Sequence, residues 1–228
     1  MTRTRFHQGL DELKDKLLRM AGLAEQAVDR AIEAYRQHEA RSCEQVYEIE
    51  KAINTAEREI DELALDLLAM QQPMAVDLRF ILSVIKINAD LERVGDQAVN
   101  IAERTSDMLA LPPAELPLDI SLMASLAAGM IRQAIEAFIH ADAELAHSVL
   151  TMDDRVDAMN REIAEAMMEQ ISRSPQLSRQ ALDALLIARN LERVADHATN
   201  IAEDVIFWVR GADVRHGGKP AAVTPPRR

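Results

Sequence analysis

The sequence predicts an all-α protein built as two tandem, pseudo-symmetric, antiparallel three-helix bundles. The first observation is composition: among 228 residues only 7 are Gly and 8 are Pro, and aromatic residues make up 3%. The second is apolar spacing of three and four residues, and the third is an internal repeat. β-Sandwiches, barrels and alternating α/β folds are disfavoured, because they need frequent turns and strands rich in β-branched or aromatic residues.

The first predicted bundle contains three helices. Apolar residues spaced three and four apart run from Phe6 past Tyr35 and describe an amphipathic helix. A second helix is expected over residues 42–70 and a third over residues 74–108. Pro73 separates them, because the residue before a proline disfavours the helical region of backbone space.

The second predicted bundle follows a proline-rich linker, LALPPAELP. Its expected helices are 118–140, 142–172 and a last helix that ends at about Arg210. Ser174 and Pro175 predict the N-cap and the first residue of that last helix. The predicted domains are residues 1–108 for the first bundle, 109–117 for the linker, 118–211 for the second bundle and 212–228 for a flexible tail.

The internal repeat is visible residue by residue. The segment LERVGDQAVNIAE at 91–103 recurs as LERVADHATNIAE at 191–203, with ten of thirteen positions identical. The segment AIEAY at 31–35 recurs as AIEAF at 134–138. The offsets are 100 and 103, so the chain reads as two copies of one three-helix unit with a small length difference between them.

Each copy carries an acidic stripe along its third helix. At 100° per residue, four oxygen-bearing side chains share an arc of about 80°. They are Glu92, Asp96, Asn100 and Glu103 in the first copy, and Glu192, Asp196, Asn200 and Glu203 in the second. Apolar residues precede the stripe on the same arc, and we expect them to face the core. They are Leu78, Ile81, Leu82 and Ile85 in the first copy, and Leu182 and Leu185 in the second.

The preceding helix carries polar residues at the matching height. If the two helices fold back near residue 72, positions whose numbers sum to about 145 face each other. The facing sets predicted in this way are Glu50 and Asn54 with Asp96 and Glu92, and Asp153 and Asp157 with Asp196 and Glu192. Converging carboxylates raise one another's pKa, and a bound cation would relieve the repulsion.

Two interpretations of the stripe remain open. Oxygen ligands without paired His or Cys favour hard cations such as Mg, Mn, Ca or oxidised Fe over zinc. Alternatively, Arg93 and Arg193 form a surface ion-pair lattice with the acids three residues further on. The first interpretation predicts metal sites, whereas the second predicts only a solvated face.

Charge and composition limit the compartment and the partners. The net charge of −12 argues against binding to nucleic acid. A single cysteine, Cys43, fits a reducing interior, and the N-terminal segment does not resemble a signal peptide, so we expect a cytoplasmic protein. The most apolar window, Leu122–Ile131, is shorter than the roughly 20 residues that span a bilayer. Membrane association is therefore expected only through partners.

Other motifs carry less information. Glu144 and His147 form an ExxH, which di-iron bundles use in pairs, but the first copy has no counterpart. His197 lies beside the stripe and is expected to be solvated or hydrogen-bonded, since Gln97 occupies the equivalent position. No nucleophile with its base is recognisable, so a non-enzymatic protein is favoured. A carboxylate-rich metalloenzyme or metal-storage protein remains the alternative.

The twin L-E-R-V-[GA]-D-x-x-x-N-I-A-E segments, with the ending VIFWVRGADVRH at 205–216, resemble the PhoU family of bacterial phosphate-uptake regulators. The resemblance implies a six-helix cytoplasmic homodimer with metal clusters on its acidic motifs, in which Asn54 departs from the expected Asp. It also implies a role between two partners, the ATPase subunit of the phosphate ABC transporter and the membrane histidine kinase that senses phosphate. The regulon of that kinase would then stay repressed when phosphate is sufficient.

Overall fold

The computed structural model describes residues 2–70, 73–117, 120–212 and 214, and within them it contains helices and no strand. The elements in chain order are α1 (Thr2–Gln37), α2 (Ala40–Met70), α3 (Ala75–Leu109), α4 (Ser121–His140), α5 (Ala143–Arg173), the short 3-10 helix η1 (Pro175–Leu177) and α6 (Ser178–Arg210). The predicted all-α class and the helix order are confirmed. Most of the predicted tail lies outside the described residues, and the domain boundaries stay a prediction.

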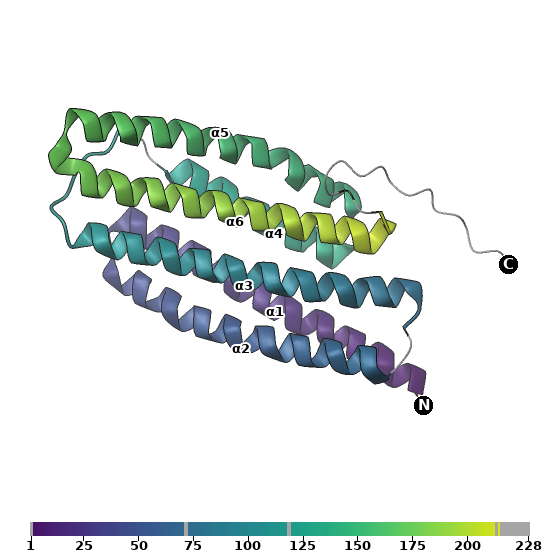
Figure 1. Cartoon of the computed structure of the whole chain (residues 1–228). Helices are drawn as coiled ribbons and strands as arrows, with labels where there is room; N and C mark the ends of the chain where they lie inside the picture. Colours follow the sequence, from purple (N-terminus) through teal and green to yellow (C-terminus); the bar gives the residue numbers. More distant parts are fainter. Residues whose placement is uncertain (1, 71–72, 118–119, 213, 215–228) are drawn as a thin grey trace.

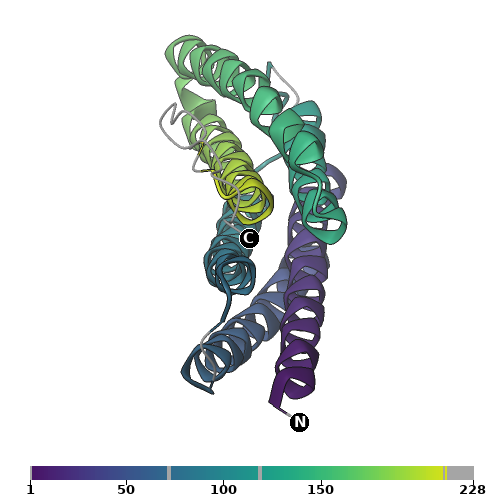
Figure 2. The same cartoon turned by 90° about the vertical axis from the view of Figure 1, so that its right-hand side faces the viewer.

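The helices form two layers. In Figure 1, α2, α3, α6 and α5 lie side by side in front, while α1 and α4 lie behind them. Figure 2 shows the same arrangement end-on. Helix α1 packs on α2 and α3, and α4 packs on α5 and α6. The most extensive contact between the two bundles joins α3 to α6, which run antiparallel along the middle of the front layer.

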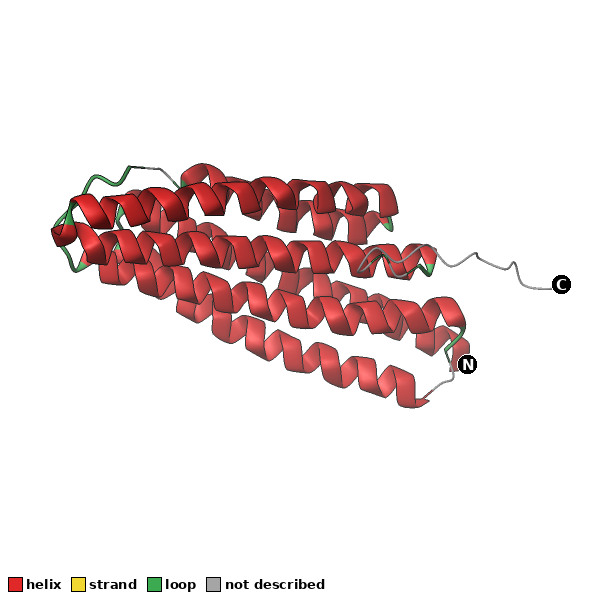
Figure 3. Cartoon of the chain, turned by 45° about the horizontal axis from the view of Figure 1, so that its top comes forward, coloured by secondary structure: helices red, strands yellow, loops and turns green. Residues whose placement is uncertain are grey.

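Turns at the ends of the long helices set their antiparallel order (Figure 3). His38 and Ala141 both have positive φ, 54° and 50°, and occupy equivalent positions in the two copies. After each of them, a backbone N–H donates to a carbonyl five residues earlier, at 3.2 and 2.9 Å. Asp142 then caps α5, because its carboxylate accepts from the N–H groups of Glu144 and Leu145. The repeat seen in the sequence therefore extends to the turn geometry.

The start of α6 differs from the prediction. Ser174 was expected to cap the last helix with Pro175 as its first residue. Instead, Ser174 occupies the N-cap position of η1, Pro175 begins η1, and α6 starts at Ser178. The Ser174 side chain makes no capping hydrogen bond. Proline still occupies the first turn of a helical segment, where its missing N–H is tolerated, so the sequence signal located the break and missed only its local form.

The core is filled by small and aliphatic side chains, with one aromatic cluster between the bundles. Phe80 of α3 meets Phe138 of α4 and Trp208 of α6, with ring centroids 6.1 and 5.1 Å apart. Phe138 and Trp208 are 5.2 Å apart. Because Phe80 belongs to the first bundle and its partners to the second, this cluster holds the two bundles together.

Helix α4 is more apolar than the sequence reasoning allowed. Its whole length, Ser121–His140, has a window of mean hydropathy 1.3 and is long and apolar enough to cross a membrane by length and composition. However, 56% of that window is buried inside the protein. Met123, Met130 and Phe138 are fully buried, so these apolar side chains are used in the core.

Candidate metal-binding clusters

The acidic residues lie along two equivalent seams, one between α2 and α3 and the other between α5 and α6. In the first seam the helices approach closely, because a Cβ added at Gly95 would lie 2.9 Å from Ile53 Cδ1. The buried Asn88 fixes the register, since its Nδ2 donates to the Glu57 carbonyl and to Asp61 Oδ1, both at 3.0 Å. These contacts agree with the register predicted from the turn at residue 72.

In the first seam, α2 and α3 bring together a set of residues that we call the first acidic cluster: Glu50, Asn54, Glu92 and Asp96. Burial raises the pKa of Glu92, and the neighbouring charges of Asp96, Glu57 and Glu50 raise it further against the opposing effect of Arg93. Asn54 donates from Nδ2 to Glu50, while its Oδ1 is buried and accepts no hydrogen bond.

Sequence reasoning missed Glu57 as a neighbour of Glu92. It follows Asn54 by three residues, which places both on the same face of α2. Its position on this face was therefore readable from the sequence.

The second seam holds the more strongly perturbed set, the second acidic cluster. Burial raises the pKa of Asp153 to about 6, with Asp196 and Asp157 as the next contributors. The pKa of Asp196 is raised by burial and by Asp157, and that of Glu192 by burial and by Asp196. Oδ1 of Asp153 and Oε2 of Glu192 are buried and accept no hydrogen bond. The four residues predicted to face one another in this copy therefore do interact.

Arginines accompany both clusters. Arg93 lies 3.3 Å from Glu92 and 3.3 Å from Asp96, as the ion-pair interpretation predicted. In the second copy Arg189 pairs with Glu192 at 2.5 Å, whereas Arg193 acts on Asp196 only at longer range. Exposed pairs of this kind contribute about 0.2–1 kcal/mol, which does not offset the repulsion among several carboxylates.

The last two residues of each predicted stripe have surroundings of their own: Asn100 and Glu103 in the first copy, and Asn200 and Glu203 in the second. Asn200 donates from Nδ2 to Asp90 Oδ1 of α3 at 3.1 Å, and Glu203 lines a groove of about 440 Å³ between α3 and α6. Glu103 lies near Tyr47 and 3.8 Å from Arg104. Asn100 is partly exposed on α3.

The clusters are not complete coordination spheres. Within the described part of the chain, no group of three or more His, Cys, Asp or Glu side chains is arranged to hold a metal ion. What the fold supplies is crowded carboxylates and buried oxygen atoms without hydrogen bonds. The metal sites therefore stay a prediction.

The apolar part of the stripe was expected to face the core, and this is wrong for three leucines. Leu78 and Leu82 are each 38% exposed, and Leu182 is 45% exposed. The prediction is confirmed for Ile81, which is fully buried, and for Ile85 and Leu185, which are partly buried against the core. Ile81 and Leu82 point about 100° apart on α3, so one side of the arc faces the core and the other side faces solvent along the seam.

His197 was expected to be solvated or hydrogen-bonded, and the hydrogen bond is confirmed. Its Nδ1 lies 2.9 Å from Asp90 Oδ1, across the contact between α3 and α6. Glu144 of the lone ExxH pairs with Arg210, and His147 is exposed.

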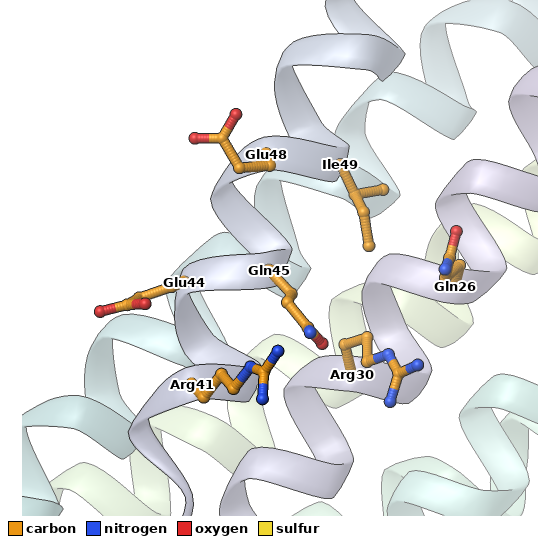
Figure 4. Close-up of a pocket in the computed structure, with 7 residues that line it drawn as sticks. All are labelled: Gln26, Arg30, Arg41, Glu44, Gln45, Glu48 and Ile49. Carbon is orange, nitrogen blue, oxygen red and sulfur yellow. The ribbon is translucent and has the colours of Figure 1, made fainter.

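A separate surface groove of about 480 Å³ lies between α1 and α2 (Figure 4). Arg30 and Arg41 line it with Gln45, while Glu44 and Glu48 point outward. Arg30 is already paired with Glu33 at 2.5 Å. This groove is separate from both seams and does not contribute to the acidic clusters.

The fold and the seams together define an internally duplicated helical-bundle protein with one acidic cluster in each copy. The family model described as PhoU domain matches residues 17–105 and again residues 120–205. The chain therefore belongs to the PhoU family.

Relatives and solved structures cover nearly the whole chain. A Pseudomonas putida protein named as a phosphate-specific transport system accessory protein PhoU homolog is 37% identical, over 93% of this chain and 84% of its own length. The Aquifex aeolicus protein of the same description is 34% identical, over 91% and 94%.

The crystal structure of PhoU from Pseudomonas aeruginosa matches with a TM-score of 0.87 and 36% identity, covering 91% of this chain and 100% of that one. The structure of the phosphate transport system regulatory protein PhoU from Streptococcus pneumoniae matches with a TM-score of 0.84 and 26% identity, over 92% and 99%.

Proposed function

We propose that this chain is a non-enzymatic regulator of phosphate uptake and phosphate-starvation signalling. The observation that carries the proposal is the match of both copies to the PhoU domain, together with relatives named as accessory proteins of a phosphate-specific transport system. Those relatives align over more than nine-tenths of this chain.

The proposed mode of action is that of an adaptor. One partner is the ATPase subunit of the phosphate ABC transporter, and the other is the histidine kinase that senses phosphate at the membrane. When phosphate is sufficient, contact with both restrains uptake and keeps the starvation regulon repressed. The two-layer architecture supports this role, because α2, α3, α6 and α5 present a long surface while α1 and α4 supply much of the core behind it. We also propose a cytoplasmic location and a homodimer.

Deletion of the gene in its source cell tests this function. A reporter fused to a phosphate-repressed promoter is expected to become constitutive in phosphate-rich medium, and a plasmid copy of the gene is expected to restore repression. Unchanged repression after deletion of this gene and of any paralogue would contradict the proposal.

We propose further that each acidic cluster holds a hard cation, Mg, Mn, Ca or Fe rather than zinc. Asp153, Asp157, Glu192 and Asp196 would hold it in the second cluster. The pKa values of Asp153, Glu192 and Asp196 are raised, and one oxygen each of Asp153 and Glu192 is buried without a hydrogen bond. Both observations support this proposal, because a cation would stabilise the charged carboxylates and bind the buried oxygens.

In the first cluster, Glu50, Glu92 and Asp96 would hold the ion with Asn54. Because Asn54 is uncharged, this cluster carries less negative charge, and we expect it to bind more weakly.

Equilibrium dialysis of chelator-stripped protein, with metal analysis, tests the sites. Native protein is expected to bind Mn or Fe, with partial loss in Asp96→Ala and greater loss in Asp196→Ala. Asp15→Ala, at an exposed position on α1, is the matched control. Equal binding by all four proteins, or no binding by the native chain, would contradict the proposed metal sites.

A further inference from the structure

Charge is divided unevenly along the sequence. All 38 Asp and Glu residues lie before residue 215, whereas residues 215–228 contain no acidic residue and four of the 26 Lys and Arg residues. The four are Arg215, Lys219, Arg227 and Arg228. The helical part of the molecule is therefore more acidic than the net charge of −12 indicates. We call residues 215–228 the basic tail.

Packing defines the point from which the basic tail leaves the helices. Helix α6 ends at Arg210, and Gly211 follows with a φ of 66° while its N–H donates to the Phe207 carbonyl at 2.8 Å. Ala212 is buried, and Val214 packs against the core. The basic tail therefore starts at a defined position at the end of α6, the helix that runs beside α5 (Figure 1).

The acidic residues nearest that position already have partners. The Asp142 carboxylate accepts two backbone N–H groups at the start of α5. Glu144 forms an ion pair with Arg210, and Asp204 pairs with Lys86 at 3.2 Å. These acids therefore attract a cationic segment less strongly than carboxylates that lack a counter-charge.

The second acidic cluster, further along the same helix, has too few cations. It consists of Asp153, Asp157, Glu192 and Asp196, and Asp154 adds to its negative charge. The cations that act most on these carboxylates are Arg189, which pairs with Glu192, and at longer range Arg193 and His197.

The buried oxygens of the second acidic cluster also lack a partner. Glu192 is only 9% exposed, yet its Oε2 accepts no hydrogen bond, and neither does the buried Oδ1 of Asp153. Charge and missing hydrogen bonds thus both indicate that a cationic ligand belongs here.

The length of the basic tail lets its last arginines reach this cluster. At 1.5 Å per residue, Asp196 lies about 21 Å from the end of α6. An extended chain covers at most about 3.3 Å per residue, so the thirteen residues from Val214 to Arg227 span up to about 43 Å. The five residues from Val214 to Lys219 span only about 17 Å. Arg227 and Arg228 therefore reach the cluster with length to spare, whereas the backbone of Lys219 falls short.

The first acidic cluster is a poorer target for the basic tail. It lies on the seam between α2 and α3, on the far side of α3 from α6 (Figure 1). It also holds the uncharged Asn54 where the second cluster has Asp157. Both distance and charge thus favour the second cluster.

We propose that the basic tail docks through Arg227 and Arg228 on the second acidic cluster of its own chain when the cluster holds no metal ion, and that tail and metal ion compete for it. Guanidinium groups bind carboxylates in bidentate geometry. The tether favours docking within one chain over docking between two, because it keeps the tail at a high effective concentration. The competition rests on the proposed metal sites, whereas the docking does not.

Zero-length cross-linking with a carbodiimide tests the docking, because it joins a lysine to a carboxylate only where the two are in contact. Arg227→Lys keeps the charge and makes position 227 reactive. In chelator-treated protein, peptide mapping by mass spectrometry is expected to find position 227 linked to Asp153, Asp157 or Asp196. Lys219 is the control on the same tail, and its yield with these acids is expected to be at least about tenfold lower.

Charge variants separate specific docking from chance encounter. When Asp153→Asn and Asp157→Asn are added to Arg227→Lys, links to Asp196 are expected to fall about tenfold, because two of the attracting charges are lost. Glu50→Gln, a matched change in the first cluster, is expected to leave the yield unchanged. Circular dichroism confirms that each variant is folded, and Asp157→Asn alone replaces the double change if that unfolds the chain.

Two results would overturn the docking. One is a set of links from position 227 that spreads evenly over Asp142, Glu144 and other exposed acids, or that the charge variants leave unchanged. The other is a set of links that join two different chains in a mixture of ¹⁵N-labelled and unlabelled protein, because the cluster would then hold the tail of a second copy.

Equilibrium dialysis with Mn tests the competition separately. Arg227→Gln/Arg228→Gln is expected to lower the Kd for Mn about tenfold, because the competing cations are removed. Lys219→Gln is the control and should bind Mn as the native chain does. Equal Kd values in all three proteins would overturn the competition, whereas a native chain that binds no Mn would overturn the proposed metal sites and leave the cross-linking result on the docking intact.

Discussion

Replacing Asp153 with Asn is expected to stabilise the metal-free protein at neutral pH. The pKa of Asp153 is raised from 3.8 to about 6, chiefly by burial and then by Asp196 and Asp157. At about 1.4 kcal/mol per tenfold change in the proton equilibrium, this rise destabilises the folded state by about 3 kcal/mol at pH 7. Because Asp153 is partly exposed, solvent screening reduces the expected gain from Asp153→Asn to about 1–2 kcal/mol.

The pH dependence identifies the cause of the gain. The folded-state pKa of Asp153 lies above the unfolded value, so the folded state loses stability as pH rises from about 4 to about 6. The difference between Asp153→Asn and the native chain should therefore be full above pH 6, shrink between pH 6 and 4, and vanish below. Saturating Mn should reverse the order, because the native cluster would then be stabilised by bound cation.

Urea unfolding followed by circular dichroism, with a chelator present, measures these differences. Asp15→Asn, an exposed acid of α1 outside both clusters, is the control and should leave the free energy of unfolding unchanged at every pH. A loss of stability in Asp153→Asn at pH 7, or a gain that persists undiminished at pH 4, would refute the electrostatic reasoning.

Three further substitutions test the helix packing, the aromatic cluster and one buried ion pair. Gly95→Val should destabilise the chain by about 1–3 kcal/mol in urea unfolding, because its branched side chain meets Ile53 across the first seam, whereas Gly95→Ala should be better tolerated. Phe138→Ala should cost about 3–5 kcal/mol and alter Trp208 fluorescence, since it opens the aromatic cluster between the bundles; an unchanged emission spectrum would argue against that contact. Arg104→Met should destabilise by about 1–3 kcal/mol at pH 7, because Arg104 lies 3.7 Å from the buried Asp183. Burial raises the pKa of Asp183, so the loss should shrink at pH 4, and an equal loss at both pH values would contradict this assignment.

Much of the fold was predictable because long helices obey simple arithmetic. Apolar spacing located all six helices, and Pro73 and Pro175 located the second turn of each bundle. Once a turn is placed, the residues that face each other across an antiparallel pair follow from their distance to it. For that reason the convergence of Asp153 with Asp196 could be predicted before the structure was known.

The contacts between the two bundles could not be predicted in this way. Asn200 and His197 bond to Asp90 of the other copy, and no turn length relates α3 to α6. The orientation of Leu82 was also missed, because core and seam differ by one residue and the acidic arc was assumed to continue the core stripe. Both errors arise where tertiary packing, rather than helix periodicity, decides which way a side chain points.

The central claim is that the chain joins two partners, and a bridging measurement tests it most directly. With the transporter ATPase immobilised, the cytoplasmic part of the histidine kinase should be retained when the purified chain is present and should pass through when it is absent. Release of the chain from the immobilised ATPase by the kinase, or the same kinase retention with and without the chain, would contradict an adaptor.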